Sequence, residues 1–86
     1  MSTGRIAFTD HALDRMRERG ASQDDVCRAI REGTPEKARE GRVLYRIELD
    51  FLAEWAGKFY TKRQVAPVVV EEGEAMVVIT VYVFYY

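Results

Sequence analysis

The sequence is poor in several residue types that define whole classes of protein. It contains one cysteine, Cys27, and one histidine, His11, among 86 residues. One cysteine cannot form an internal disulfide framework, and one cysteine with one histidine cannot supply the ligands of a usual zinc site. We therefore expect neither a disulfide-stabilised fold nor a metal centre, and no residue pattern points to a cofactor. Cys27 itself reads as a buried, inert thiol.

Long apolar runs are also missing. No apolar stretch approaches the ~18 residues of a membrane-spanning helix, and the first ten residues lack the apolar region of a secretory signal. Two prolines and six glycines are too few for a low-complexity chain. These absences predict a cytoplasmic protein that does not enter a membrane.

An excess of positive charge is the third absence. The chain has 13 Lys and Arg against 14 Asp and Glu, whereas a nucleic-acid-binding domain normally carries a clear basic excess. The segment 66–86 has no basic residue and three acidic ones, Glu71, Glu72 and Glu74. Any contact with nucleic acid is therefore confined to a local patch. The 48% hydrophobic content excludes disorder, and 86 residues make a single domain over 1–86.

The first third of the chain carries the boundary signals of two helices. Thr9 is a good N-cap for a helix over about 10–19, and Gly20 is suited to end that helix in the left-handed conformation. Ser22 opens a capping-box pattern before a second helix over about 23–32.

The rest of the chain reads as β-structure. From residue 42 to residue 86 the apolar period changes to two, as in strands with one buried face. The register between Asp50 and Ala66 is left open. Two helices followed by such strands predict an α+β fold, in which the helices pack on a three- or four-stranded antiparallel sheet.

Strict alternation in the last predicted strand, 76–86, assigns one face to the core: Val77, Ile79, Val81 and Val83. The other face carries the hydroxyls of Thr80 and Tyr82, which can orient a phosphate or donate to a leaving oxygen. The same two residues are also ordinary strand formers on a solvent face, and the strand alone favours that interpretation.

The first helix carries His11, Arg15 and Arg19 at successive turns, so their side chains lie within an arc of roughly 80°. A guanidinium matches phosphate oxygens in a bidentate manner, and a neutral imidazole can take a proton from a hydroxyl. The stripe therefore contains the parts for phosphodiester chemistry. Spacing alone favours the plainer interpretation, a solvated helix face with ion pairs.

One further segment interleaves basic and aromatic side chains, a pattern that suits single-stranded RNA and equally suits a solvent face. Its residues are Lys58, Tyr60, Lys62 and Arg63.

Residues 11–20 read HALDRMRERG and residues 80–82 read Thr-Val-Tyr. The pattern HAxxRMxxRG, followed by a capped second helix and a final strand of this type, resembles a small bacterial domain-of-unknown-function family, number four-two-five-eight. That family is similar to the BrnT and RelE toxins of the barnase–EndoU–colicin–RelE ribonuclease superfamily.

The resemblance implies a RelE/barnase-like fold and a metal-independent ribonuclease of a toxin–antitoxin system. It implies that His11 is the general acid/base and that Arg15 and Arg19 hold the scissile phosphate. Thr80 and Tyr82 would complete the catalytic site from the last strand. The partners implied are an RNA and an antitoxin protein.

A second hypothesis comes from the residues alone. The chain could be a non-catalytic module that forms a homodimer, or binds another protein, through its C-terminal strand and an open sheet face. The aromatic side chains on which this hypothesis rests are Tyr60, Tyr82, Phe84 and Tyr86.

Overall fold

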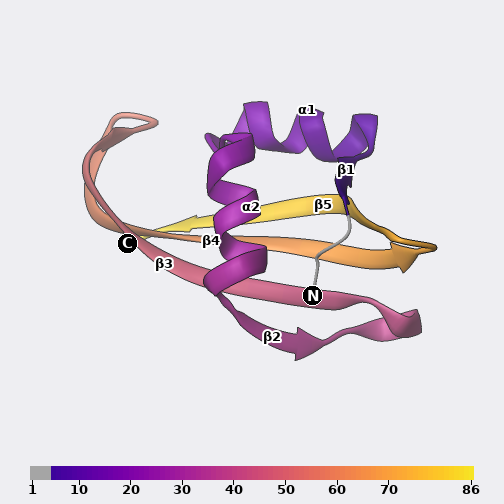
Figure 1. Cartoon of the computed structure of the whole chain (residues 1–86). Coiled ribbons are helices and arrows are strands. Elements are labelled where there is room, and N and C mark those ends of the chain that lie inside the picture. The colour runs from indigo at the N-terminus through magenta and orange to yellow at the C-terminus, as the bar shows by residue number, and fades with distance from the viewer. Residues whose placement is uncertain (1–4) are drawn as a thin grey trace.

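The computed structural model describes residues 5–86, which form one five-stranded sheet and two α-helices. The strands are β1 (Arg5–Phe8), β2 (Thr34–Lys37), β3 (Val43–Trp55), β4 (Lys58–Glu72) and β5 (Ala75–Tyr85). Their order in the sheet is β1-β5-β4-β3-β2 (Figure 1). A short 3₁₀ turn, η1 (Arg39–Gly41), connects β2 to β3. The predicted α+β class is confirmed.

The helices are α1 (Asp10–Arg19) and α2 (Gln23–Glu32), and their bounds coincide with the predicted ranges. The Thr9 side chain accepts a hydrogen bond from the Ala12 amide, as an N-cap does. Ser22 and Asp25 exchange both bonds of a capping box. Neither helix in the described part of the chain is long and apolar enough to cross a membrane.

The sheet has five strands rather than the three or four that the sequence predicts, and it is mixed. β1 pairs in parallel with β5, whereas all other neighbours are antiparallel. β2 has the sequence TPEK and all four residues are exposed, so it carries no apolar alternation. Such short peripheral strands exist because a neighbour supplies hydrogen bonds, which a local pattern does not reveal.

The core lies between one face of the sheet and the two helices. α2 crosses this face, while α1 runs alongside β5 (Figure 1). The buried cluster combines side chains from both helices and the two central strands: Ala12, Met16, Val26, Val65, Val69, Val78 and Val81. Burial of valine side chains drives the packing, at roughly 1.5–3 kcal/mol for each one fully buried.

A β-bulge in β5 corrects the predicted faces of that strand. Val69 pairs with Val78 and Val68 pairs with Thr80, so Ile79 is an extra residue opposite β4. Val78 and Val81 are both fully buried, whereas Val77 and Ile79 are only partly buried. The prediction that Val77 and Ile79 share the core face with Val81 is therefore wrong, because one inserted residue reverses the alternation.

The β3–β4 hairpin is long and bends toward the helix side of the sheet (Figure 1). A register shift between Asp50 and Ala53 places a second bulge there, with Leu52 at a φ of 52°. The turn residues Ala56 and Gly57 both have positive φ, as in the type I′ turn that matches strand twist. This pairing defines the register of the segment that the sequence left open.

Candidate functional site

The last turn of α1 is joined to β5 through the side chain of Arg19. The Arg19 Nη1 donates a hydrogen bond of 2.8 Å to the Val81 carbonyl oxygen. The same guanidinium lies 5.4 Å from the centroid of the Tyr82 ring. Arg19 therefore sets a cation beside the strand that carries Thr80 and Tyr82.

The first turn of α1 is joined to β5 as well. The Thr9 amide donates to the Val78 carbonyl at 3.1 Å, and the Thr9 Oγ1 donates to the Ile79 carbonyl at 3.4 Å. α1 is thus fixed at both ends along the outer edge of β5. It covers part of an edge that would otherwise be open to another strand.

His11 and Arg15 lie between these two fixed points. They precede Arg19 by two turns and one turn, so they project from the same side of α1 as the residue that reaches Val81. His11 is exposed, and Arg15 forms an ion pair with Glu18. No hydrogen bond within residues 5–86 joins His11 to the other four predicted catalytic residues.

Thr80 and Tyr82 follow the bulge of β5 and project from the same face of the sheet. By register, Thr80 lies opposite Val68 and Tyr82 lies opposite Ala66. Thr80 is partly buried, and Tyr82 is 42% exposed. The structure therefore brings Arg19 and Tyr82 into contact. Within residues 5–86, no hydrogen bond or ion pair joins Thr80 or Tyr82 to His11 or Arg15.

The four residues predicted to bind RNA do not share one surface. Lys58 and Tyr60 lie near the hairpin tip, where the Lys58 Nζ is 5.6 Å from the Tyr60 ring centroid. Lys62 is paired with Asp50 at 2.9 Å across β3 and β4. This ion pair raises the pKa of Lys62 and lowers that of Asp50.

Arg63 lies on the helix side of the sheet, where its side chain is only 14% exposed. Its Nη1 donates to the Gly20 carbonyl, and its Nη2 donates to the Asp25 carboxylate, each at 2.8 Å. Burial raises the pKa of Asp25, but hydrogen bonds from the Ser22 amide and from Arg63 outweigh it, so the net pKa is lowered. Arg63 thereby ties β4 to the start of α2.

Tyr85 is a residue whose importance at this junction the sequence does not reveal. Its hydroxyl donates a hydrogen bond of 2.6 Å to the Arg19 carbonyl. Its ring stacks on Trp55, with centroids 5.0 Å apart, and also contacts Phe51 and Tyr60. Burial raises the pKa of the Tyr85 hydroxyl, which keeps it a neutral donor.

Gly20 explains how this aromatic cluster fits against α1. Its φ is 82°, and a Cβ atom there would lie 2.6 Å from the Tyr85 hydroxyl and 2.8 Å from the Trp55 ring. Gly20, the final residue of the HAxxRMxxRG pattern, is therefore the residue in that pattern that signals the close contact between α1 and the aromatic cluster.

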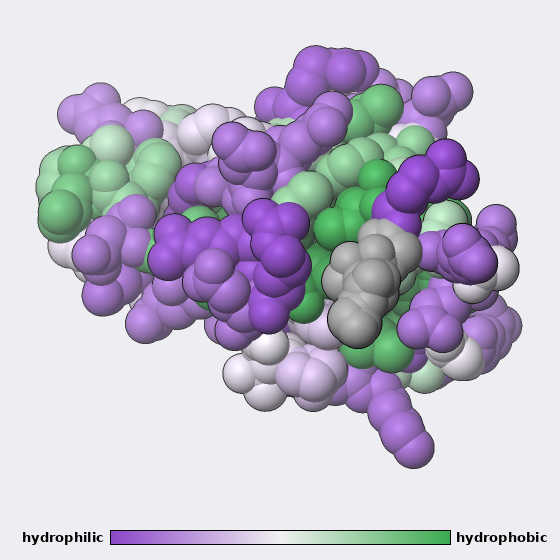
Figure 2. All heavy atoms as spheres, viewed as in Figure 1, coloured by the Kyte–Doolittle hydropathy of each residue, from purple (hydrophilic) through white to green (hydrophobic). Residues whose placement is uncertain are grey.

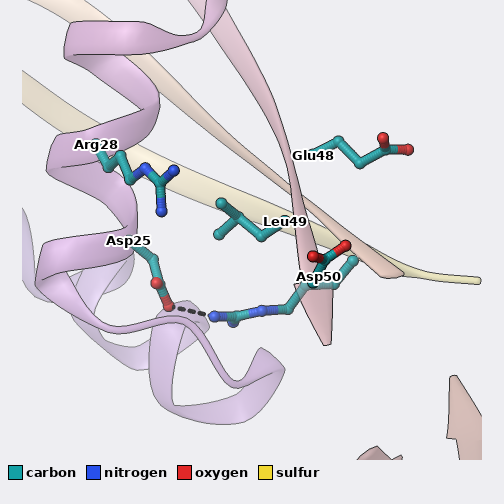
Figure 3. Close-up of a pocket in the computed structure, with 6 residues that line it drawn as sticks. Asp25, Arg28, Glu48, Leu49 and Asp50 are labelled. Carbon is teal, nitrogen blue, oxygen red and sulfur yellow. Dashed lines mark hydrogen bonds and ion pairs between the residues drawn. The ribbon is translucent and has the colours of Figure 1, made fainter. Parts of the chain in front are cut away.

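An open groove of about 400 Å³ lies elsewhere, between α2 and β3. Its lining residues are Asp25, Arg28, Glu48, Leu49, Asp50 and Arg63 (Figure 3). Leu49 lies between the helix and the strand, while the Glu48 side chain points away from α2. The charged groups are already paired, as the dashed contact between Asp25 and Arg63 illustrates (Figure 3).

The helix side of the molecule is mainly hydrophilic over α2 (Figure 2). The apolar region at the left of Figure 2 covers the bent end of the β3–β4 hairpin. Leu52 and Phe59 belong to this hairpin and are 65% and 57% exposed.

Comparison with curated proteins and with solved structures gave no match. Residues 8–83 match a family described as Domain of unknown function (DUF4258). The match includes the whole of α1 and most of β5, and hence both sides of the junction described above. Because it spans most of the chain, this protein belongs to the DUF4258 family.

Proposed function

We propose that the protein is a ribonuclease that cleaves RNA without a metal ion, with the junction of α1 and β5 as its active site. The observation that carries this proposal is the position of Arg19, which contacts both the Val81 carbonyl and the Tyr82 ring. This contact joins the cationic stripe of α1 to the hydroxyl-bearing face of β5. The net charge of −1 is compatible with this proposal, because RNA cleavage needs only a local cationic site.

The ribose 2′-hydroxyl serves as the internal nucleophile. His11 takes the proton of that hydroxyl, and the 2′-oxygen attacks the adjacent phosphorus. The bond from phosphorus to the 5′-oxygen breaks, and that oxygen takes a proton from the Tyr82 hydroxyl. The protonated His11 then releases its proton to solvent, and the Tyr82 oxygen regains one from solvent. The products are a 2′,3′-cyclic phosphate and a free 5′-hydroxyl.

Arg15 and Arg19 stabilise the charge that develops on the phosphoryl oxygens. Arg15 is held by Glu18 in the free protein, but an exposed pair of this kind contributes only ~0–1 kcal/mol. Phosphate can therefore displace the Glu18 carboxylate at little cost. Thr80 orients the phosphate from the strand side.

We extend the proposal to a biological role on the resemblance to BrnT and RelE toxins that the sequence pattern suggests. In that role the protein acts on RNA in the cytoplasm, and an antitoxin protein covers the site until the protein is released. Expression of the free chain is expected to arrest growth, whereas expression of the His11→Ala variant is expected to leave growth unchanged.

The proposal is tested by cleavage of a fluorescent single-stranded RNA. Arg19→Ala is expected to slow cleavage strongly, whereas Arg17→Ala is a matched control. Arg17 lies on the same helix, is 73% exposed and is paired with Asp14. An RNA with one deoxynucleotide at the cleaved position must resist cleavage, because the nucleophile is missing. Cleavage of that substrate contradicts the mechanism.

A second candidate function is that of a protein-interaction module, which the exposed apolar side chains favour. Leu52, Phe59 and Phe84 are each about half exposed or more. Such a module forms a homodimer or binds a partner such as an antitoxin. Light scattering and the cleavage assay together distinguish the candidates. The interaction module is favoured if the wild type is a dimer that does not cleave RNA and if Phe84→Ser dissociates this dimer.

A further inference from the structure

We propose that Tyr82, Phe84 and Tyr86 form a stacking surface for the bases of single-stranded RNA. We call these three residues the aromatic row. The inference rests on the proposed function, because it names the class of substrate and the path that leads this substrate to Arg19. The aromatic row differs from the RNA-binding segment that the sequence predicts, because the structure places the residues of that segment in different surroundings.

The aromatic row occupies the face of the sheet that the helices leave uncovered. Val81 and Val83 belong to, or pack against, the core cluster on the helix side. The alternating residues after the bulge therefore project to the opposite face. Tyr82, Phe84 and Tyr86 are 42%, 47% and 50% exposed.

The neighbouring strand leaves these rings open. By register, Tyr82 lies opposite Ala66 and Phe84 lies opposite Gln64. Ala66 carries only a methyl group, which is too short to cover the Tyr82 ring, and that ring is 42% exposed. Several exposed rings next to one another on a strand indicate a binding surface, whereas single exposed apolar residues are common on any protein surface.

The spacing of the rings suits nucleotides that have been pulled out of a helix. The centroids of Tyr82 and Phe84 are 6.4 Å apart, and the two rings are within 18° of parallel. This distance is about twice the 3.4 Å rise of a stacked strand, so each ring can serve a separate base. Sheet surfaces that bind single-stranded RNA stack two or three bases on aromatic side chains in this way.

Cations lie at both ends of the aromatic row. Arg19 contacts Tyr82, and within residues 5–86 it has no carboxylate partner. At the other end, the Tyr86 amide donates to the Lys62 carbonyl, which places the Lys62 residue beside Tyr86. A phosphate backbone that follows the row therefore meets the free charge of Arg19 at the proposed catalytic end. At the other end, Lys62 is already paired with Asp50 at 2.9 Å, and phosphate must compete with that carboxylate.

The dimensions of the surface favour a nucleic acid strand over a folded protein. The row is a single strand wide, and its flank on β4 and β3 is polar, with Gln64 and Glu48 beside the rings. The Tyr86 hydroxyl is hydrogen-bonded to Glu48. A stable protein interface needs a broad apolar centre, whereas a single strand needs a narrow track of rings with charge along it.

Binding of a 2′-O-methyl oligouridine, measured by fluorescence anisotropy at low salt, tests this proposal. The methyl group blocks the nucleophile, so binding is measured separately from cleavage. Phe84→Ala is expected to weaken binding about tenfold, the loss of one base–aromatic stack. Phe59→Ala is the matched control, because Phe59 is an exposed phenylalanine outside the row. That variant is expected to bind like the wild type.

Equal affinity of Phe84→Ala and the wild type overturns the stacking proposal, and so does the absence of wild-type binding. A change of oligomeric state in Phe84→Ala with unchanged RNA binding also overturns it, and assigns the row to self-association. Binding that depends on Phe84 without cleavage of unmodified RNA keeps the stacking surface but refutes the ribonuclease. Cleavage of unmodified RNA together with binding that does not depend on Phe84 keeps the ribonuclease but refutes the stacking surface.

Discussion

The guanidinium of Arg19 lies 5.4 Å from the ring of Tyr82 while it donates a hydrogen bond to the Val81 carbonyl. One side chain thus links the basic stripe of α1 to the backbone and an aromatic ring of β5, two features that lie more than sixty residues apart. The residues around Arg19 that hold it in this position can each be tested by substitution.

Tyr85→Phe tests the bond that holds the Arg19 backbone. The variant loses the hydroxyl that donates to the Arg19 carbonyl at 2.6 Å but keeps the stacked ring. We expect the free energy of unfolding in urea to fall by about 0.5–1.5 kcal/mol. Tyr86→Phe is the control, since its hydroxyl contacts Glu48 at the exposed surface. An equal loss in both variants would show that the Arg19 contact has no special weight.

Gly20→Ala tests the close approach of the aromatic cluster to α1. The left-handed conformation alone costs an alanine about 1–2 kcal/mol. Gly73→Ala measures that cost, because Gly73 has a φ of 61° and open space around it. Gly20→Ala is expected to cost at least about twice as much, since its Cβ also meets Tyr85 and Trp55. Equal unfolding free energies for the two variants would remove the packing argument.

Val78→Ala tests the bulge in β5. Val78 is fully buried and Val77 is not, so truncation of Val78 is expected to cost about 2 kcal/mol and truncation of Val77 clearly less. Thermal and urea unfolding of both variants provide the comparison. A larger loss for Val77 would restore the regular alternation and contradict the bulge.

Acid titration tests the pairing of Asp25 with Arg63. The folded-state pKa of Asp25 is lowered, so its contribution to stability is present above the unfolded pKa near 3.8 and is lost as the pH falls through the folded value. Asp25→Asn is expected to be less stable than the wild type at pH 7, by about 2 kcal/mol, and the difference should shrink as the solution is acidified below that pKa. A difference that does not depend on pH would disprove the charge argument.

The helices were predictable because their ends depend on local chemistry. Thr9 and Ser22 bond to amides three residues ahead, and Gly20 adopts the conformation that only glycine takes easily. These signals lie within a few residues of the boundary that they set, and the observed bounds match the predicted ones.

The faces of β5 were only partly predictable, because a bulge depends on a partner strand. Nothing near Ile79 in the sequence shows that Val68 and Val69 on β4 pair around it. The burial of Arg63 has the same origin. Its neighbours in sequence suggest an exposed basic segment, whereas its partners, Gly20 and Asp25, come from the other end of the chain.

The sequence predicts the candidate site as a set of residues but not as an arrangement. Helical spacing places His11, Arg15 and Arg19 on one stripe, and the family pattern adds the end of β5. The contact of Arg19 with β5 and the support from Tyr85 require the folded chain. That support comes from an aromatic cluster whose members are dispersed over β3, β4 and β5.

The most direct test of the ribonuclease proposal is the rate of RNA cleavage by the wild type and by His11→Ala, in the presence of a chelator. Loss of a general base is expected to slow cleavage at least about 100-fold, while Arg17→Ala keeps the wild-type rate. The cleaved RNA should end in a 2′,3′-cyclic phosphate. Cleavage by His11→Ala at the wild-type rate, or no cleavage by the wild type, would contradict the proposal.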